Sequence, residues 1–156
     1  MIQGSCLCGG TKFEIDERHI LLINNCYCTN CRKVSGAAFG TFVQIPGEHF
    51  RWLAGQELVS TYESSPGIHR AFCRVCGSRA PQSANWAEIV GIPAGCLDGD
   101  PVARPVVSIF AESKAAWHEI DESITSVSGF GTEEFWRSFE PARAYIEWQL
   151  SRSRDR

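Results

Sequence analysis

GSCLCGG, residues 4–10, places two cysteines one residue apart and directly before two glycines. A second cluster, CYCTNC, spans residues 26–31, and a third, CRVCG, spans residues 73–77. Seven of the chain's 8 cysteines therefore lie in three short clusters. Four cysteines saturate a tetrahedral zinc ion, whereas three leave one coordination position for water or substrate. The cysteine count thus predicts one closed, structural zinc site and one open site.

We pair Cys6 and Cys8 with Cys73 and Cys76 as the closed site. Their short spacings can hold two sulfur atoms about 3.5–4 Å apart around one ion, because zinc–sulfur bonds are about 2.3 Å. The adjacent glycines let the chain turn so that backbone amides point toward the sulfurs. An alternative joins the whole CYCTNC cluster to one outside cysteine, and it ranks lower because it strands members of the other pairs.

The open site would use Cys26, Cys28 and Cys31, which are the candidate catalytic residues. Arg32 and Lys33 follow directly, and two cations there would lower the thiol pKa values and attract an anionic substrate. They are the candidate substrate-binding residues, although such residues are most often simply exposed. A substrate thiol would bind at the open position, or zinc would polarise the carbonyl or adduct oxygen as a Lewis acid.

The remaining metal-binding residue types give weaker signals. Cys96 has no neighbouring cysteine, and a lone cysteine is most often a small buried hydrophobe; completing the second zinc site is its less favoured role. The four histidines show no spacing that supplies two metal ligands on one face, so each is expected to be structural or exposed. Among them, His118 could line a pocket. They are His19, His49, His69 and His118.

Two other uses of the cysteines are less favoured than zinc binding. A disulfide scaffold is disfavoured because Cys6 and Cys8 are too close to bridge easily and because such scaffolds have no need for clustering. An iron–sulfur centre also uses thiolates, but all-sulfur ligation favours zinc here.

Composition narrows the class of protein. The 156 residues, 44% hydrophobic, are enough for one globular domain with its own core. A net charge of -3, from 15 basic and 18 acidic residues, gives no electrostatic case for nucleic acid or an anionic membrane. No apolar run approaches the roughly 20 residues that span a bilayer, and the first residues do not resemble a signal peptide. We expect a cytoplasmic protein, whose thiols stay reduced.

The pattern of apolar residues and turns predicts a mainly β fold with a helical C-terminal extension. Alternation and Pro/Gly turns indicate strands at residues 11–15, 39–45, 49–53, 58–62, 68–72, 87–92 and 106–110. Thr132 is a candidate N-cap, followed by two glutamates suited to a helix start. A second helix is expected over 141–150. We expect residues 1–125 to form the zinc-binding domain and 126–156 to be an extension packed on it.

The three clusters together resemble those of a known family. GSCLCGG (4–10), CYCTNCRKVSG (26–36) and FCRVCGS (72–78) match the glutathione-dependent formaldehyde-activating enzyme family, whose domain is shared with centromere protein V. FRW (50–52), AGCLD (94–98), SIF (108–110) and WH (117–118) fit as well. The resemblance covers roughly residues 2–122.

The resemblance implies small β-sheets around a zinc-knuckle pair, with structural zinc on the 6/8/73/76 cysteines and catalytic zinc on the 26/28/31 cysteines. It also implies a carbon–sulfur lyase that joins glutathione to formaldehyde as S-hydroxymethylglutathione, with a small thiol as the substrate partner. A rival hypothesis is a non-catalytic zinc module in which both clusters staple a binding surface. A third is a thiol switch in which the open-site cysteines cycle through disulfides.

Overall fold

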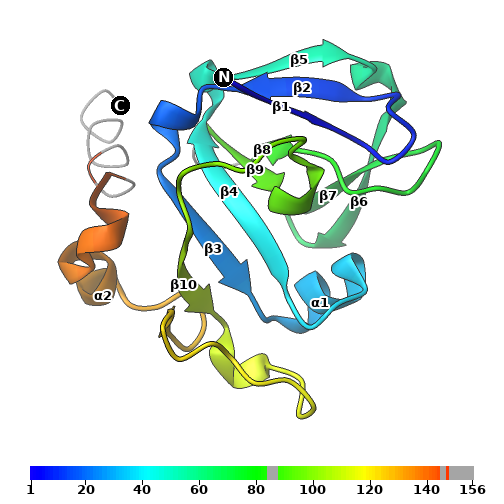
Figure 1. Ribbon diagram of the computed structural model, residues 1–156. Coiled ribbons are helices and arrows are strands. Elements are labelled where there is room, and N and C mark those ends of the chain that lie inside the picture. Colours follow the sequence, from blue (N-terminus) through cyan, green and yellow to red (C-terminus); the bar gives the residue numbers. More distant parts are fainter. Residues whose placement is uncertain (84–87, 145–146, 148–156) are drawn as a thin grey trace. The chain divides into compact units, whose positions relative to one another are not determined.

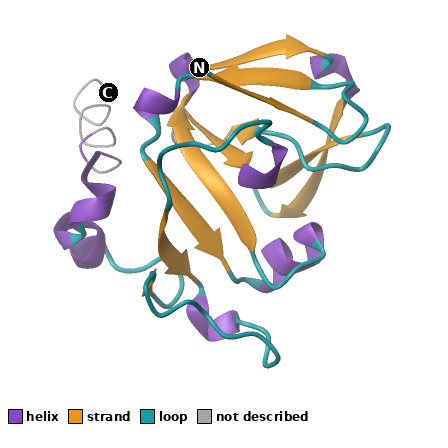
Figure 2. Cartoon of the chain, in the orientation of Figure 1, coloured by secondary structure: helices purple, strands orange, loops and turns teal. Residues whose placement is uncertain are grey.

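Short strands joined by tight turns make up most of the backbone of this computed structural model (Figure 1, Figure 2). The structure describes residues 1–83, 88–144 and 147. The chain divides into two compact units, and each is described by itself. Unit 1 comprises residues 1–20 and 42–103, and unit 2 comprises residues 21–41 and 104–156.

The first sheet of unit 1 is antiparallel, with the strand order β1-β2-β5. Its strands are β1 (Ile2–Ser5), β2 (Lys12–Ile15) and β5 (Phe50–Ala54). Phe13 is buried beneath this sheet and packs against Phe50 and Trp52, with ring centroids 5.6 and 6.0 Å away. Aromatic pairs at such separations add to the stabilisation that burial itself gives. The cluster fixes the sheet that carries Cys6 and Cys8 in the turn after β1.

Two further antiparallel groups complete unit 1. Strands β6 (Val59–Ser65) and β7 (Ile68–Cys73) form a hairpin. Strand β9 (Ile89–Pro93) lies between β4 (Gly40–Pro46) and β8 (Gln82–Ser83). The side chains of Val43, Ile45 and Ile92 are fully buried, as the apolar positions of a sheet with a covered face should be.

In unit 2 the central strand is β10 (Pro105–Ile109), which is parallel to both of its neighbours. These are β3 (Leu22–Cys26) and β11 (Thr125–Ser126). All five residues of β3 are buried, including Asn24 and Asn25. The Thr41 hydroxyl donates a hydrogen bond of 2.8 Å to the Asn25 side-chain oxygen, which offsets the cost of burying that amide.

Among the described residues, two α-helices with both ends defined and several 3₁₀ turns lie between and after the strands. The α-helices are α1 (Thr29–Ser35) and α2 (Glu133–Ser138), and the 3₁₀ turns are η1 (Glu17–His19), η2 (Gly47–His49), η3 (Gln56–Leu58), η4 (Ala94–Cys96), η5 (Ala111–Ser113) and η6 (Glu140–Ala142). No described helix is long and apolar enough to cross a membrane.

The mainly β prediction is confirmed, and each strand expected from sequence overlaps an observed one. Thr132 caps α2 as predicted, because its hydroxyl accepts the Phe135 amide hydrogen bond at 3.1 Å. The helix expected over 141–150 begins with η6, and Arg143, Ala144 and Glu147 are helical; the other half of that range lies outside the described residues. Parallel pairing in unit 2 was not expected, nor were β1, β3 and α1. The division at residue 125 stays a prediction.

Candidate metal centres

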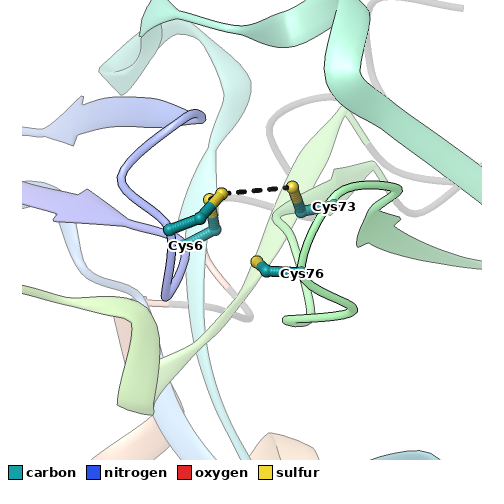
Figure 3. A group of neighbouring side chains, drawn as sticks. Cys6, Cys73 and Cys76 are labelled. Carbon is teal, nitrogen blue, oxygen red and sulfur yellow. Dashed lines mark hydrogen bonds between the residues drawn. The ribbon is translucent and has the colours of Figure 1, made fainter.

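Four cysteines of unit 1 bring their sulfur atoms within 4.8 Å of one another, and all four are those predicted for the closed site. Cys6 and Cys8 come from the turn after β1, while Cys73 ends β7 and Cys76 lies in the turn that follows. The Sγ–Sγ distances are 3.4 Å for Cys6–Cys8 and 4.0 Å for Cys8–Cys73. A tetrahedron of sulfurs around zinc has edges of about 3.8 Å, so the group fits this ion. Figure 3 shows the Cys6, Cys73 and Cys76 sulfurs directed toward one another.

Hydrogen bonds favour the thiolate form at Cys6 and Cys76, whereas at Cys8 the Gly10 backbone opposes but does not offset the neighbouring thiols, which raise its pKa to about 11. Burial opposes ionisation of Cys6, but the 3.3 Å hydrogen bond from the Thr11 amide and contacts with neighbouring thiols outweigh it and lower its pKa to about 7. Hydrogen bonds from the Ser78 side chain and backbone lower the pKa of Cys76 to about 5. The Ser78 hydroxyl also accepts the Leu7 amide hydrogen bond at 3.0 Å. This contact links the turn that carries Cys6 and Cys8 to the turn that carries Cys76.

The second group consists of Cys26, Cys28 and Cys31 in unit 2, again with sulfurs within 4.8 Å of one another. Cys26 ends β3, Cys28 is the N-cap of α1, and Cys31 lies in its first turn. The Cys28 sulfur accepts a hydrogen bond from the Cys31 amide at 3.3 Å. Proximity to Cys31, together with burial, raises the pKa of Cys26. Thiols crowded in this way share protons, and a cation among them would replace those protons.

The accessibility of these three cysteines differs. Cys26 and Cys31 are buried, whereas Cys28 is half-buried. Within the described part of the chain, no fourth sulfur, imidazole or carboxylate joins the group. Three thiolates with one accessible side are suited to a zinc ion that retains an exchangeable position.

An aromatic cluster borders the triad in unit 2, and Tyr27 is its centre. The Tyr27 ring is only 2% exposed and packs against Phe39 and His118, with centroids 5.0 and 5.7 Å away. The rings of Phe39 and His118 are themselves 5.4 Å apart. Burial raises the pKa of Tyr27. Sequence reasoning did not select Tyr27 or Phe39, although an aromatic residue between two ligands was a usable signal.

Arg32 and Lys33 occupy the last turn of α1, next to the triad. The Arg32 side chain is partly buried, and its Nε is buried without a hydrogen-bond partner among the described residues. Lys33 is exposed. Two cationic residues therefore follow the three-cysteine group on the same helix.

Cys96 lies in unit 1 and belongs to neither cysteine group. Its thiol donates to the Arg79 carbonyl oxygen at 3.2 Å, and burial raises its pKa. These contacts are those of a packed thiol rather than of a ligand for the triad. All eight cysteines are free thiols, so the disulfide alternative has no counterpart in the structure.

The chain is similar to several known proteins. The family described as glutathione-dependent formaldehyde-activating enzyme matches residues 1–113. A Halomonas elongata protein named "Putative glutathione-dependent formaldehyde-activating enzyme" is 32% identical over 130 residues, covering 78% of this chain and 82% of that protein. A crystal structure of a Rhodobacter sphaeroides protein aligns with a TM-score of 0.52 at 23% identity, over 63% of this chain and 89% of the other. That likeness concerns the fold alone.

Proposed function

The chain belongs to the glutathione-dependent formaldehyde-activating enzyme family, and from this premise we propose that it is a zinc-dependent carbon–sulfur lyase. Its substrates would be a glutathione-like thiol and formaldehyde, or the S-hydroxymethyl adduct of the two. The observation that carries the proposal is the three-cysteine group without a fourth protein ligand among the described residues, next to two basic side chains.

The proposed reaction is a reversible addition. The thiol sulfur forms a bond to the aldehyde carbon, the carbon–oxygen π bond breaks, and the thiol proton ends on the oxygen. A zinc ion held by Cys26, Cys28 and Cys31 would supply Lewis acidity and stabilise negative charge on sulfur or oxygen. A second zinc ion on the four cysteines of unit 1 would be structural.

The basic residues would orient the thiol substrate. Glutathione carries two carboxylates, and a guanidinium binds a carboxylate through two parallel hydrogen bonds. The partly exposed Arg32 side chain would offer its terminal nitrogens to such a group, while exposed Lys33 would act as a mobile second charge. Binding the far end of the substrate in this way would place its sulfur next to the half-buried Cys28.

The aromatic cluster would limit water at the same place. Tyr27, Phe39 and His118 pack ring against ring, so bulk solvent does not pass between them. Lower local polarity strengthens the charge interactions on which thiolate binding depends. A drier site also slows loss of the adduct to hydration.

Calorimetric titration of glutathione into zinc-replete protein tests this proposal, with zinc per chain counted on the same sample. We expect saturable binding and two zinc ions per chain. Cys28→Ser should abolish binding and activity and remove one zinc ion, while leaving the fold and the other zinc intact. Cys96→Ser is the matched control and should change neither zinc count nor binding. Two zinc ions without any thiol binding would favour the non-catalytic zinc module.

A further inference from the structure

We propose that unit 1 carries a further metal site, formed by Asp16, His19 and His49, for a divalent transition metal ion such as Ni²⁺. The three residues each offer one ligand atom, and these atoms lie within 4.8 Å of one another. None of them belongs to either cysteine group, so the inference does not depend on the proposed enzyme function.

The backbone holds the two contributing turns together. Asp16 is the N-cap of η1, and its backbone amide donates to the His49 carbonyl oxygen at 3.1 Å. His49 closes η2, just before β5. This β5 strand pairs with β2, which ends at the residue before Asp16. The ligands are therefore fixed by a strand pair rather than by a loose loop.

The donor chemistry suits a transition metal. The His19 Nε2 lies 3.8 Å from the Asp16 carboxylate, and the two imidazoles stack with centroids 3.5 Å apart and 8° between planes. Two imidazoles with one carboxylate form a donor set that zinc, nickel and iron(II) accept. The Asp16 carboxylate supplies the negative charge, as an aspartate does at neutral pH. Glu48 adds a second carboxylate, 3.6 Å from the His49 Nε2.

Two adjustments would accompany binding. Parallel rings direct their nitrogen lone pairs along parallel lines, so one ring must turn for both to meet a single ion. The His19 side chain is 45% exposed and is the one with room to do so. Arg18 must also release Asp16, which it now contacts at 2.6 Å. Its side chain is 80% exposed, so it can swing into solvent when an ion takes its place.

The role of Arg18 gives the proposal a distinctive consequence. If a metal ion and Arg18 compete for the same carboxylate, removing the guanidinium should tighten metal binding. If surface histidines captured the ion without Asp16, Arg18 would not compete with it. Removal of the guanidinium would then leave metal binding unchanged.

Zinc-replete protein is titrated with Ni²⁺ by calorimetry, and zinc release is followed in the same sample. We expect one Ni²⁺ per chain without loss of zinc. Binding should weaken at least tenfold in His19→Gln and His49→Gln, stay unchanged in His69→Gln, and tighten severalfold in Arg18→Ala. His69 is an exposed histidine of the same unit, and Arg18→Ala tests the site without altering a ligand.

Several outcomes would overturn the site. These are the absence of saturable binding, equal losses in the His19 and His69 variants, weaker binding in Arg18→Ala, and stoichiometric zinc release that places nickel on the cysteines. Since glutathione is absent from this experiment, its failure would leave the proposed lyase function untouched.

Discussion

Tyr27 stacks on His118, with ring centroids 5.7 Å apart and 27° between the ring planes. Tyr27 lies between two cysteines of the triad, whereas His118 comes from the segment after β10. Unit 2 therefore holds the peptide that carries Cys26 and Cys28 against a distant part of the chain. The position of the triad depends on this contact as well as on the local backbone.

Replacing His118 by Ala should weaken zinc binding at the triad. An aromatic pair contributes about 0.5–1.5 kcal/mol beyond its buried area, which corresponds to roughly 2- to 13-fold in an equilibrium constant. Competition with a chromogenic chelator measures the affinity of each zinc ion. His69→Ala is the control and should change neither. If the affinity of the triad for zinc were unchanged in His118→Ala, Tyr27 would be held in position without the imidazole.

Arg32→Ala should reduce glutathione affinity more than Lys33→Ala. A hydrogen bond to a charged partner from a buried group contributes about 1.5–3 kcal/mol, or roughly 10- to 150-fold. An exposed pair contributes about 1 kcal/mol or less. Calorimetric titration of the two variants compares their glutathione affinities. Substitution of the exposed Lys12 in unit 1, Lys12→Ala, is the control. Equal effects of all three substitutions would indicate non-specific charge attraction and no defined carboxylate site.

Cys73→Ser should remove the zinc ion proposed for the four-cysteine group and destabilise unit 1. Cys73 is fully buried at the end of β7, so its loss breaks a closed ligand set around the knuckles. We expect the zinc count to fall by one and the thermal midpoint to fall by about 10 °C, on the order of 3–5 kcal/mol for a chain of this size. Mass spectrometry of the native protein and calorimetry measure both. Loss of both zinc ions would show that the sites do not bind independently.

Gly55→Ala should be strongly destabilising. Gly55 has a φ of +70°, and an added Cβ would lie 2.0 Å from the Gly10 carbonyl oxygen. The left-handed backbone costs about 1–2 kcal/mol and the clash a further 1–3 kcal/mol. Gly67→Ala is the matched control, because its φ is +74° with no atom within 4 Å of the added carbon. In urea unfolding, Gly67→Ala should show only the cost of the left-handed backbone. Equal losses of unfolding free energy in the two variants would mean that Gly10 moves aside freely.

The stability that Asp16 contributes should depend on pH. Its folded pKa is lowered by the Arg18 hydrogen bonds, so the unfolded state binds a proton more readily than the folded state. The stabilisation by the Asp16 carboxylate is fully present above about pH 4, the ordinary pKa of a carboxyl group. It is lost as the pH falls through the lower pKa of the folded state. Wild-type protein should therefore exceed Asp16→Asn in unfolding free energy at pH 7 and pH 5, and by less at pH 3.5. The Asn side chain still caps η1, so a gap that widens on acidification would contradict the assignment.

Several parts of the fold followed from sequence because their causes are local. Alternation of apolar and polar residues located β2 and β7, and the hydroxyl of Thr132 located the start of α2. Strand β3 reads LINNC and was missed because both of its faces are buried, which removes the alternation. Its parallel partner β10 is far along the chain, and no local pattern specifies that pairing.

The sequence by itself determined the three cysteine clusters, because cysteines two or three positions apart are held close by a single turn; the fold brought Cys6 and Cys8 to Cys73 and Cys76. Only the tertiary structure brought His118 to Tyr27 and placed Cys96 in unit 1. It also stacked His19 on His49, which lie thirty residues apart in the sequence. Those contacts depend on strand register and on turns that meet after folding. Register is set by the sum of many weak packing interactions, so no single spacing in the chain could reveal it.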